Sequence, residues 1–323
     1  MNLSDIAREA GVSVATVSKA FSGAKDIGAA TRERIFAVAK QHGCFDHYNK
    51  NKFEKPVIAV LTPELSEHYT AITGFLDREI TARGGIMLES LTGFSPEREA
   101  ELFQYYTGYA HVDGIILIDE RGEIQNTTQV PAVAFHRKKR RYIDNIVLNF
   151  DRGIEDALRY LKEEGHTDVG FAGEELTTGK QEGFCRAMRK VGLPLQKKRI
   201  KTTKARFETA GEELAAEWLR EGDLPTAIMT PYDHIAIGAI RYFRRHGVRV
   251  PEDISVIGMD DIPVAPYFDY SLTSIRVPTE TACCEAVNLL FKKLQNQHYS
   301  TRQSTVLYAE FVARETTGKA AKK

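Results

Sequence analysis

The chain has 323 residues, with 44 Lys and Arg, 44 Asp and Glu, and 42% hydrophobic residues. This length and balanced composition predict two or three compact units with a large buried core, and they exclude a disulfide-stapled miniprotein or a long disordered chain. No apolar run reaches the roughly 18 residues of a membrane helix, and Asp5, Arg8 and Glu9 interrupt any apolar signal sequence. We therefore expect a cytoplasmic protein without a membrane partner.

Residues 1–55 carry more positive charge than the rest of the chain. They hold nine Lys and Arg against six Asp and Glu, a formal charge of +3, so the remainder carries −3. A basic segment joined to a slightly acidic body indicates a polyanionic partner for that segment. The alternative is a solvated charged surface without a partner.

Three short amphipathic helices are predicted at the start of the chain. Asn2 can cap the first helix and Gly11 can end it in the left-handed conformation, after which Ser13 can cap the second. A turn of about three residues between two helices is typical of helix-turn-helix. The apolar positions expected to face a common core are Leu3, Ile6, Ala7 and Ala10, then Val14, Val17 and Phe21, then Ile35, Val38 and Ala39.

The second helix presents Ala15, Thr16 and Lys19 on its outward face, which could enter a DNA major groove. From the pattern alone, the alternative is a three-helix module with no role in nucleic-acid binding.

The stretch DIAREAGVSVATVSKAFSG, followed by TRERI, resembles the DNA-binding head of the LacI/GalR family of bacterial transcription regulators. This resemblance implies double-stranded operator DNA as a partner. The family commonly has Arg at the position of Lys19, and Lys lacks the planar fork that reads two acceptors together. By the resemblance, base edges are faced by Val14, Ala15 and Lys19, and phosphates are held by Ser13, Thr16, Ser18 and Thr31.

From residue 57 onward, strand-sized apolar runs alternate with amphipathic stretches. The runs are VIAVL, IMLES, DGIILI, VPAVAF, VGFAG, AIMT and ISVIGMD, and helices are expected near residues 69–83, 96–109, 153–164, 180–191, 209–221 and 233–246. Such alternation predicts parallel sheets between helices. One doubly wound sheet of this length would be unusually large, so we expect two lobes with a ligand at the carboxyl ends of their strands.

The same region resembles the effector-binding core of the LacI/GalR family through DGIIL, GHTDVGF, VPEDISVIGMDD and SLTSIRVP. The resemblance implies a fold like that of periplasmic sugar-binding proteins, with a ligand between two lobes. It places three crossovers near residues 145–149, 274–278 and 304–308.

The expected fold is therefore an N-terminal all-α helix-turn-helix head followed by an α/β core of two doubly wound parallel-sheet lobes. The head is expected at residues 1–45, a hinge or linker at 46–56, and an effector-binding and dimerisation core at 57–323. The first lobe would comprise about 57–146 plus 278–305, and the second about 147–277 plus 306–320. The tail ETTGKAAKK has no leucine heptads, which favours a homodimer over a tetramer.

The linker departs from the family pattern, which has Y-x-P-N, then small residues and a Leu that enters the minor groove. Here the corresponding residues are Cys44, Asp46, His47 and Phe53. Phe53 remains an acceptable minor-groove wedge, whereas Lys50 stands where two hinge helices would pack through a small residue. Either the hinge helices pair less closely, with Lys50 and Lys52 on phosphates, or the linker is a disordered tether.

An effector site is expected where polar and aromatic side chains follow strands. By the resemblance, Asp260 accepts ligand hydroxyl groups, Lys180 replaces a clamping Arg, and Tyr69, in the loop after the first strand, is an aromatic plate. Alternatively, Lys180 is an exposed lysine on a helix and Tyr69 is a tyrosine of the hydrophobic core. The other candidate effector residues are His136, Asn149, Phe207 and Tyr232. The implied effector is a sugar, a sugar phosphate or a related polyol, and the run RKKRR at 137–141 is either a solvated loop or the rim of an anion site.

Enzymatic function is not expected. The chain lacks G-x-x-x-x-G-K-[ST], a strand-following G-x-G-x-x-G, H-E-x-x-H and G-x-S-x-G. The four cysteines include no C-x-x-C, so no zinc site, disulfide framework or cofactor is indicated. Asp260 and Asp261 are adjacent on a strand end and should point apart, which argues against shared acid-base chemistry.

The sequence predicts a homodimeric repressor that binds a near-palindromic operator and responds to an effector held between its lobes. The remaining alternatives are a periplasmic or transport binding protein, and a regulator that has lost its inducer and senses a phosphoprotein or nothing.

Overall fold

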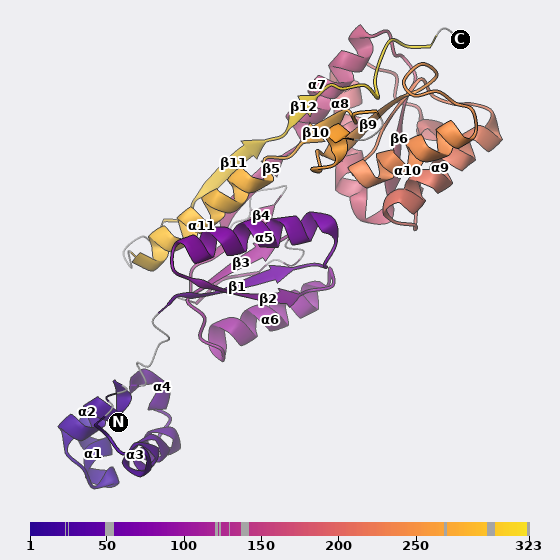
Figure 1. Ribbon diagram of the computed structural model, residues 1–323. Coiled ribbons are helices and arrows are strands. Elements are labelled where there is room, and N and C mark those ends of the chain that lie inside the picture. The colour runs from indigo at the N-terminus through magenta and orange to yellow at the C-terminus, as the bar shows by residue number, and fades with distance from the viewer. Residues whose placement is uncertain are drawn as a thin grey trace.

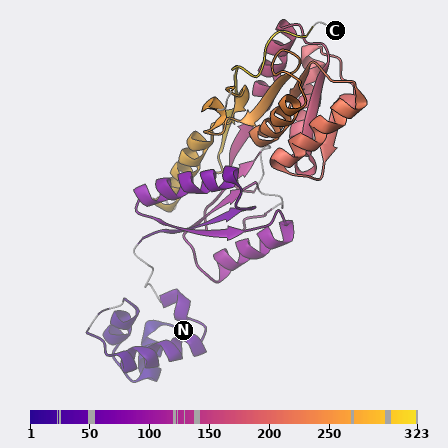
Figure 2. The ribbon, with the colours of Figure 1, turned by 45° about the vertical axis from the view of Figure 1, so that its right-hand side comes forward.

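A computed structural model describes residues 1–22, 24, 26–48, 55–119, 122, 124–128, 130–136, 142–267, 270–295 and 301–321, without the side chains of Asp46 and His136. A small helical head precedes an α/β core of two lobes (Figure 1). The lobes follow one another along the long axis of the core, and the head lies beyond the first lobe in both views (Figure 2). This architecture confirms the predicted fold class.

The head contains α1 (Leu3–Ala10), α2 (Val14–Phe21), α3 (Ala29–Gln41) and the single turn α4 (Phe45–Tyr48). The predicted caps are confirmed: Asn2 Oδ1 accepts the amide hydrogen bond of Asp5 at 3.0 Å, and Gly11 ends α1 at φ 65°. Ser13 Oγ accepts from the amide of Thr16 at 3.1 Å at the start of α2. Helices α1, α2 and α3 enclose a core that includes Ile6, Ala7, Ala10, Val17, Phe21, Ile35 and Ala39.

Two expectations about the head are wrong. Val14 does not face the core, because it is the first residue of α2 and is 43% exposed. The segment expected to begin the linker at residue 46 instead folds into α4, whose Phe45 and Tyr48 pack against the head core. Phe53, the expected minor-groove wedge, lies outside the described residues, as do Lys50 and Lys52.

The first lobe is a parallel six-stranded sheet with the order β11-β5-β4-β3-β1-β2. Helices α5 and α11 cover one face, where Leu76 and Leu290 are buried, and α6 covers the other, where Phe103 is buried. The elements are β1 (Val57–Thr62), α5 (Glu67–Ala82), β2 (Ile86–Leu91), α6 (Pro96–Gly108), β3 (Gly114–Ile118), β4 (Ala132–His136), β5 (Asp144–Asn149), α11 (Thr279–Gln295) and β11 (Ser304–Tyr308).

The second lobe is a six-stranded sheet with the order β12-β10-β9-β8-β6-β7. Helices α7 and α8 cover one face and α9 and α10 the other, where Trp218 and Phe243 are fully buried. The elements are α7 (Asp151–Glu163), β6 (Val169–Glu174), η1 (Glu175–Thr177), α8 (Thr178–Val191), η2 (Lys197–Arg199), β7 (Ile200–Thr203), α9 (Phe207–Glu221), β8 (Ala227–Met229), α10 (Asp233–Arg245), β9 (Ser255–Asp260), η3 (Ala265–Tyr267), β10 (Ser274–Arg276) and β12 (Glu310–Val312).

The chain passes between the sheets three times: after β5, after β10, and between β11 and β12. Strands β5 and β11 extend the first sheet to Asn149 and Tyr308, beyond the lobe limits expected at 146 and 305. Strand β12 is antiparallel to β10, with Ser274 opposite Val312. Since β10 leaves the second lobe at the side where β12 enters it, the two strands must run in opposite directions, and the second sheet is not purely parallel.

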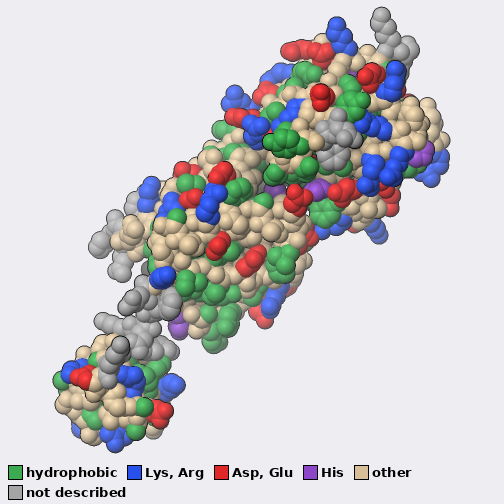
Figure 3. Space-filling model, in the orientation of Figure 1, with side chains coloured by type: hydrophobic (Ala, Val, Ile, Leu, Met, Phe, Trp, Pro, Cys, Tyr) green, Lys and Arg blue, Asp and Glu red, His purple; other side chains and the backbone are tan. Residues whose placement is uncertain are grey.

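Lys and Arg side chains are interspersed with Asp and Glu over both lobes in the view of Figure 3. Among the described residues, no helix has the length and apolar composition needed to span a membrane. All four cysteines are free, and Cys44 and Cys283 are buried. Within the described part of the chain, no cluster of three potential metal ligands occurs.

Candidate functional site

Helix α2 and its cap present an exposed outward face. This face carries Ser13, Val14, Ala15, Ser18 and Lys19. Thr16 is half-buried on the same helix, and its hydroxyl lies 2.8 Å from that of Ser13. Thr31, also half-buried, lies in the first turn of α3. The candidate DNA-contacting residues that the structure describes therefore belong to α2, its cap and the start of α3, which is the arrangement of helix-turn-helix proteins.

Lys19 has a partner that the sequence did not reveal. Its Nζ lies 2.5 Å from Asp26 Oδ2, in the connection between α2 and α3. The hydrogen bond from Lys19 lowers the pKa of Asp26. Both side chains are more than half exposed, so DNA phosphates or base edges can compete for the same ammonium group.

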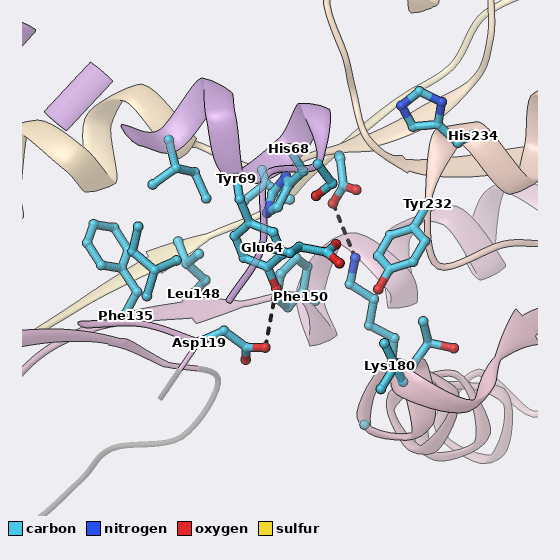
Figure 4. A pocket seen from close by; sticks show the side chains of 18 of the residues that line it. Glu64, His68, Tyr69, Asp119, Phe135, Leu148, Phe150, Lys180, Tyr232 and His234 are labelled. Carbon is cyan, nitrogen blue, oxygen red and sulfur yellow. Dashed lines mark hydrogen bonds and ion pairs between the residues drawn. The ribbon is translucent and has the colours of Figure 1, made fainter. Parts of the chain in front are cut away.

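A cavity of about 580 Å³ lies between the two lobes at the carboxyl ends of several strands (Figure 4). Of the seven candidate effector residues, six line this cavity: Tyr69, Asn149, Lys180, Phe207, Tyr232 and Asp260. His136 ends β4, and its side chain lies outside the described residues. The run at residues 137–141 is also outside them.

Lys180 and Asp260 form the polar centre of the second-lobe wall. Lys180 Nζ donates to the carbonyl oxygen of Pro231 at 2.6 Å and to Asp260 Oδ1 at 3.2 Å. Figure 4 shows Lys180 reaching into the cavity beside Tyr232. The same ammonium lies 4.6 Å from the ring centroid of Tyr232 and 5.2 Å from that of Phe150. The side chains of the pair are only 11% and 8% exposed. Lys180 is therefore not an exposed helix lysine, and it can donate to a ligand while Asp260 accepts from one.

The neighbouring carboxylate, Asp261, points elsewhere. It pairs with Arg276 and Arg314 at 2.7 Å each, whereas Asp260 faces Lys180. Asp260 and Asp261 have φ of 106° and 54°, so the chain turns sharply at the end of β9. As predicted, the two carboxylates share no site.

Tyr69 lies in the first turn of α5, not in the preceding loop as expected. The helix begins at Glu67, and Tyr69 points into the cavity, where its hydroxyl donates to Asp119 Oδ2 at 3.3 Å (Figure 4). Asn149 and Tyr232 lie beside the ends of other elements at the cavity. Asn149 Oδ1 accepts a hydrogen bond from the amide of Asp151 at 2.9 Å, at the start of α7.

Tyr232 precedes α10. Burial raises the pKa of its hydroxyl group, which therefore stays protonated.

Sequence reasoning missed one ion pair and one close polar contact that join the lobes across the cavity. Arg206, at the start of α9, donates to both carboxylate oxygens of Glu64 in the first lobe, at 2.6 and 3.0 Å. His234 of α10 lies 3.0 Å from Glu67 of α5 and 2.7 Å from Glu208 of α9. No spacing in the sequence brings these residues together, because 142 positions separate Glu64 from Arg206.

The missed residues change the electrostatics of the cavity. Burial alone would raise the pKa of Glu64, but hydrogen bonds from Arg206 and Ser66 outweigh it and lower that pKa. Burial lowers the pKa of His68, whose ring lies beside Tyr69. His68 is therefore neutral at physiological pH and can donate from one ring nitrogen while accepting at the other. Asp119, which follows β3, could have been found by the strand-end rule that identified Asp260.

Two glycines bring α9 and α10 close together. A Cβ at Gly211 would lie 2.1 Å from the carbonyl oxygen of Ile235, and one at Gly238 would lie 2.0 Å from that of Glu208. Because only glycine permits this approach, the starts of the two helices lie side by side. Phe207 and Tyr232, with ring centroids 6.2 Å apart, consequently share one wall of the cavity.

Comparison with known proteins finds matches to both the helical head and the α/β core. Residues 2–44 match the family model described as bacterial regulatory proteins, lacI family, and residues 158–317 match the periplasmic binding protein-like domain. The chain belongs to the LacI family. It is a DNA-binding transcriptional regulator and not an enzyme.

Full-length relatives of this LacI-family chain share both parts. The HTH-type transcriptional repressor CytR of Escherichia coli K12 is 28% identical over 337 residues, covering 98% of this chain and 96% of CytR. The lac repressor dimer bound to operator and the anti-inducer ONPF has a TM-score of 0.74 at 22% identity, covering 98% of this chain and 99% of that one. A complex of the transcriptional regulator CelR with cellobiose has a TM-score of 0.67 at 22% identity, with the same coverage.

Proposed function

We propose that this LacI-family regulator is a homodimeric repressor that binds a near-palindromic operator and is controlled by a small sugar-like effector. The observation that carries the proposal is the cavity between the lobes, in a chain that also bears a helix-turn-helix head. A two-fold protein matches two-fold DNA, so each head would read one half-site. The relative CytR is named as a repressor, and the lac repressor comparison is a dimer on its operator.

At the DNA, Val14, Ala15 and Lys19 would face base edges of the major groove. Their exposure on one face of α2 supports this assignment. Phosphates would be held by Ser13, Thr16, Ser18 and Thr31, and Phe53 would be the minor-groove wedge.

In the cavity, Asp260 would accept ligand hydroxyl groups while Lys180 donates to ligand oxygens. Tyr69, Phe207 and Tyr232 would stack on the ring faces of a sugar, and Asn149 and His136 would complete the polar contacts. Support comes from the position of six of these residues in one cavity, and from the cellobiose complex of a structural relative. We propose a sugar, sugar phosphate or related polyol as the effector class.

Effector and operator would be coupled through the angle between the lobes. A ligand that binds one lobe arrangement better than another shifts the population towards it. The coupling is reciprocal, so an inducer binds more weakly to the operator-bound protein and a corepressor binds more tightly.

The first test is thermal unfolding of the full-length protein against sugars, sugar phosphates, polyols and nucleosides. A ligand at 100 times its dissociation constant adds about 2.7 kcal/mol to the free energy of unfolding, which gives a measurable increase in Tm. A stabilising sugar or sugar phosphate supports the proposal. A panel in which only compounds of other classes stabilise the protein contradicts the proposed effector class, and a panel without any hit contradicts control by such small molecules.

A further inference from the structure

The chain turns sharply after β9, at the wall of the cavity. Asp260 and Asp261 have φ of 106° and 54°, a region that residues other than glycine rarely adopt. Such a backbone persists only where the surrounding structure holds it. Asp260 lines the cavity and faces Lys180, so the contacts that hold this turn also set the position of the Asp260 carboxylate.

Two buried side chains hold the turn. Asp233, the first residue of α10, accepts from the amide of Ile262 through Oδ2 at 2.8 Å and from the hydroxyl of Ser274 through Oδ1 at 2.6 Å. The same Ser274 oxygen accepts from the amide of Asp261 at 3.1 Å. Asp233 and Ser274 are fully buried. The two amides that follow Asp260 are therefore both fixed by one pair of side chains.

Strand β9 packs directly on this pair. A Cβ at Gly258 would lie 2.1 Å from Asp233 Oδ1, so only glycine leaves room for the carboxylate. The side chain of Asp261 is held separately by two arginine side chains, at 2.7 Å each. Neither Asp233 nor Ser274 is among the described residues that line the cavity. An effect of either residue on a ligand must therefore pass through the turn.

We propose that Asp233 and Ser274 are positioning residues for effector binding. Together they hold the backbone after Asp260 so that its carboxylate stays within reach of Lys180 and of a ligand hydroxyl group. The inference rests on the proposed function, in which Asp260 accepts hydrogen bonds from the effector. The competing explanation is a purely structural role, since any buried hydrogen-bonded pair stabilises the folded state.

The position of Asp260 can be tested without a ligand. Crystal structures are determined for the full-length wild type, for Ser274→Ala and for a matched control, Ser255→Ala. Ser255 is also fully buried, but it begins β9 and bonds to Gly318, at the strand end opposite Asp260. In Ser274→Ala we expect Asp260 to lose its positive φ and its contact with Lys180, whereas Ser255→Ala should keep both. An unchanged Asp260 in Ser274→Ala overturns the inference.

Effector binding is tested with a defined probe, the sugar among D-ribose, sucrose and cellobiose that most increases the Tm of the wild type. Its affinity is measured by calorimetry in Ser274→Ala, in Asp260→Ala and in the double variant. We expect Ser274→Ala alone to lower the affinity at least about fivefold, because the carboxylate no longer meets the sugar in the right place. In the Asp260→Ala background the same substitution should change the affinity by less than about twofold, since the group that Ser274 positions is gone.

Asp233→Asn is the conservative variant, because its amide keeps an oxygen for Ile262 and can donate to the hydroxyl of Ser274. It should retain the sugar affinity of the wild type within about twofold, as should Ser255→Ala. Equal losses from Ser274→Ala with and without the Asp260 carboxylate would show an independent structural effect and overturn the inference. If none of the three sugars increases the Tm, that result counts against the proposed effector class, and the crystal structures still decide whether Ser274 positions Asp260.

Discussion

Arg206 of the second lobe and Glu64 of the first form a bidentate ion pair across the interlobe cavity, with N–O distances of 2.6 and 3.0 Å. Arg206 also pairs with Glu174 at 3.3 Å, and Glu174 is almost fully buried in the second lobe. Glu64, on the opposite lobe, is the member of this group that moves if the cavity opens. The pair therefore links the two lobes directly.

Glu64→Gln should shift the ligand-free protein towards open lobes. The substitution removes the charge of Glu64 while leaving Arg206 its partner Glu174. The measurement is a pulsed EPR distance between labels at exposed positions Glu101 and Arg245, in a background with Cys185 and Cys284 replaced by Ser. We expect a single short distance in the parent protein and a longer or broader distribution in the variant. Identical distributions would show that this ion pair does not control closure.

Asp260→Asn should weaken effector binding and leave operator affinity without effector unchanged. The carboxylate accepts from Lys180 in a largely buried environment, and hydrogen bonds to charged groups contribute about 1.5–3 kcal/mol. Effector affinity should therefore fall at least about tenfold, while operator affinity without effector stays within about twofold. Both affinities can be measured by calorimetry and fluorescence anisotropy.

Asp253→Asn is the matched control for this experiment. Asp253 pairs with Arg249 at 2.6 Å in the same lobe and is not among the cavity-lining residues. It should leave effector affinity unchanged. An effector response that survives in Asp260→Asn would place the effector elsewhere.

Lys19→Ala should weaken specific operator binding by about 1–3 kcal/mol and relax the base preference at one position of each half-site. If Lys19 instead contacts a phosphate, the loss of affinity should be similar for all DNA sequences. The slope of log affinity against log salt concentration should then become shallower by about one unit. Anisotropy titrations over a range of salt concentrations and operator variants distinguish these outcomes. Effector affinity should not change, and a simultaneous loss of both affinities would indicate misfolding.

Asp26→Asn should have the opposite effect on DNA affinity. Asp26 holds the Lys19 ammonium at 2.5 Å and brings a negative charge near the DNA-binding face. Its neutral replacement frees Lys19 and removes repulsion from phosphates. We expect tighter binding to specific and non-specific duplexes at low salt. Weaker binding would mean that the ion pair orients Lys19 for its contact.

Asp233 should make stability depend on pH. Burial raises its pKa to about 8 from a model-peptide value of 3.8, although Ser274 and the amide of Ile262 donate to its oxygens. Between these values the folded state binds more protons than the unfolded state, so the free energy of unfolding falls as pH rises. The contribution of this one group is at most about 1.4 kcal/mol per pH unit.

The measurement is urea unfolding between pH 5 and 8 for the wild type and Asp233→Asn. Asparagine cannot ionise, so the pH dependence of the wild type should exceed that of the variant, and the difference between the two curves isolates Asp233. A difference that is constant with pH would show that Asp233 is ionised throughout this range.

The sequence predicted most of the fold because the core strands are continuous apolar runs and the helices have one apolar stripe. It missed β7, since IKTT is a short edge strand without an apolar pattern, and β12, since its direction depends on the path between lobes. The pattern also missed helix α11, and β5, β10 and β11 were expected only as crossover positions from the family resemblance. It placed Val14 in the head core because helical spacing alone does not distinguish the first turn of a helix from its interior. The polar segment that forms α4 was predicted to be a linker. Its aromatic residues, Phe45 and Tyr48, pack against other residues only in the folded head, so no sequence pattern reveals the contact.

The cavity was predictable only in part. Asp260 and Asn149 end strands, and the carboxyl ends of parallel strands indicate where a ligand binds. Arg206 and Glu64 carry no such signal, because their pairing depends on how two separately folded lobes face each other. Sequence patterns describe each lobe, whereas the interaction between lobes appears only in three dimensions.

A ligand bound in the interlobe cavity should change DNA binding by the head. The most direct measurement is the operator affinity of full-length protein with and without a saturating sugar-like ligand found by thermal unfolding. We predict a change of about fivefold to 150-fold, the usual range of allosteric coupling, and a smaller change in Asp260→Asn at the same ligand concentration. An operator affinity that stays the same while the wild-type cavity is occupied would contradict the account.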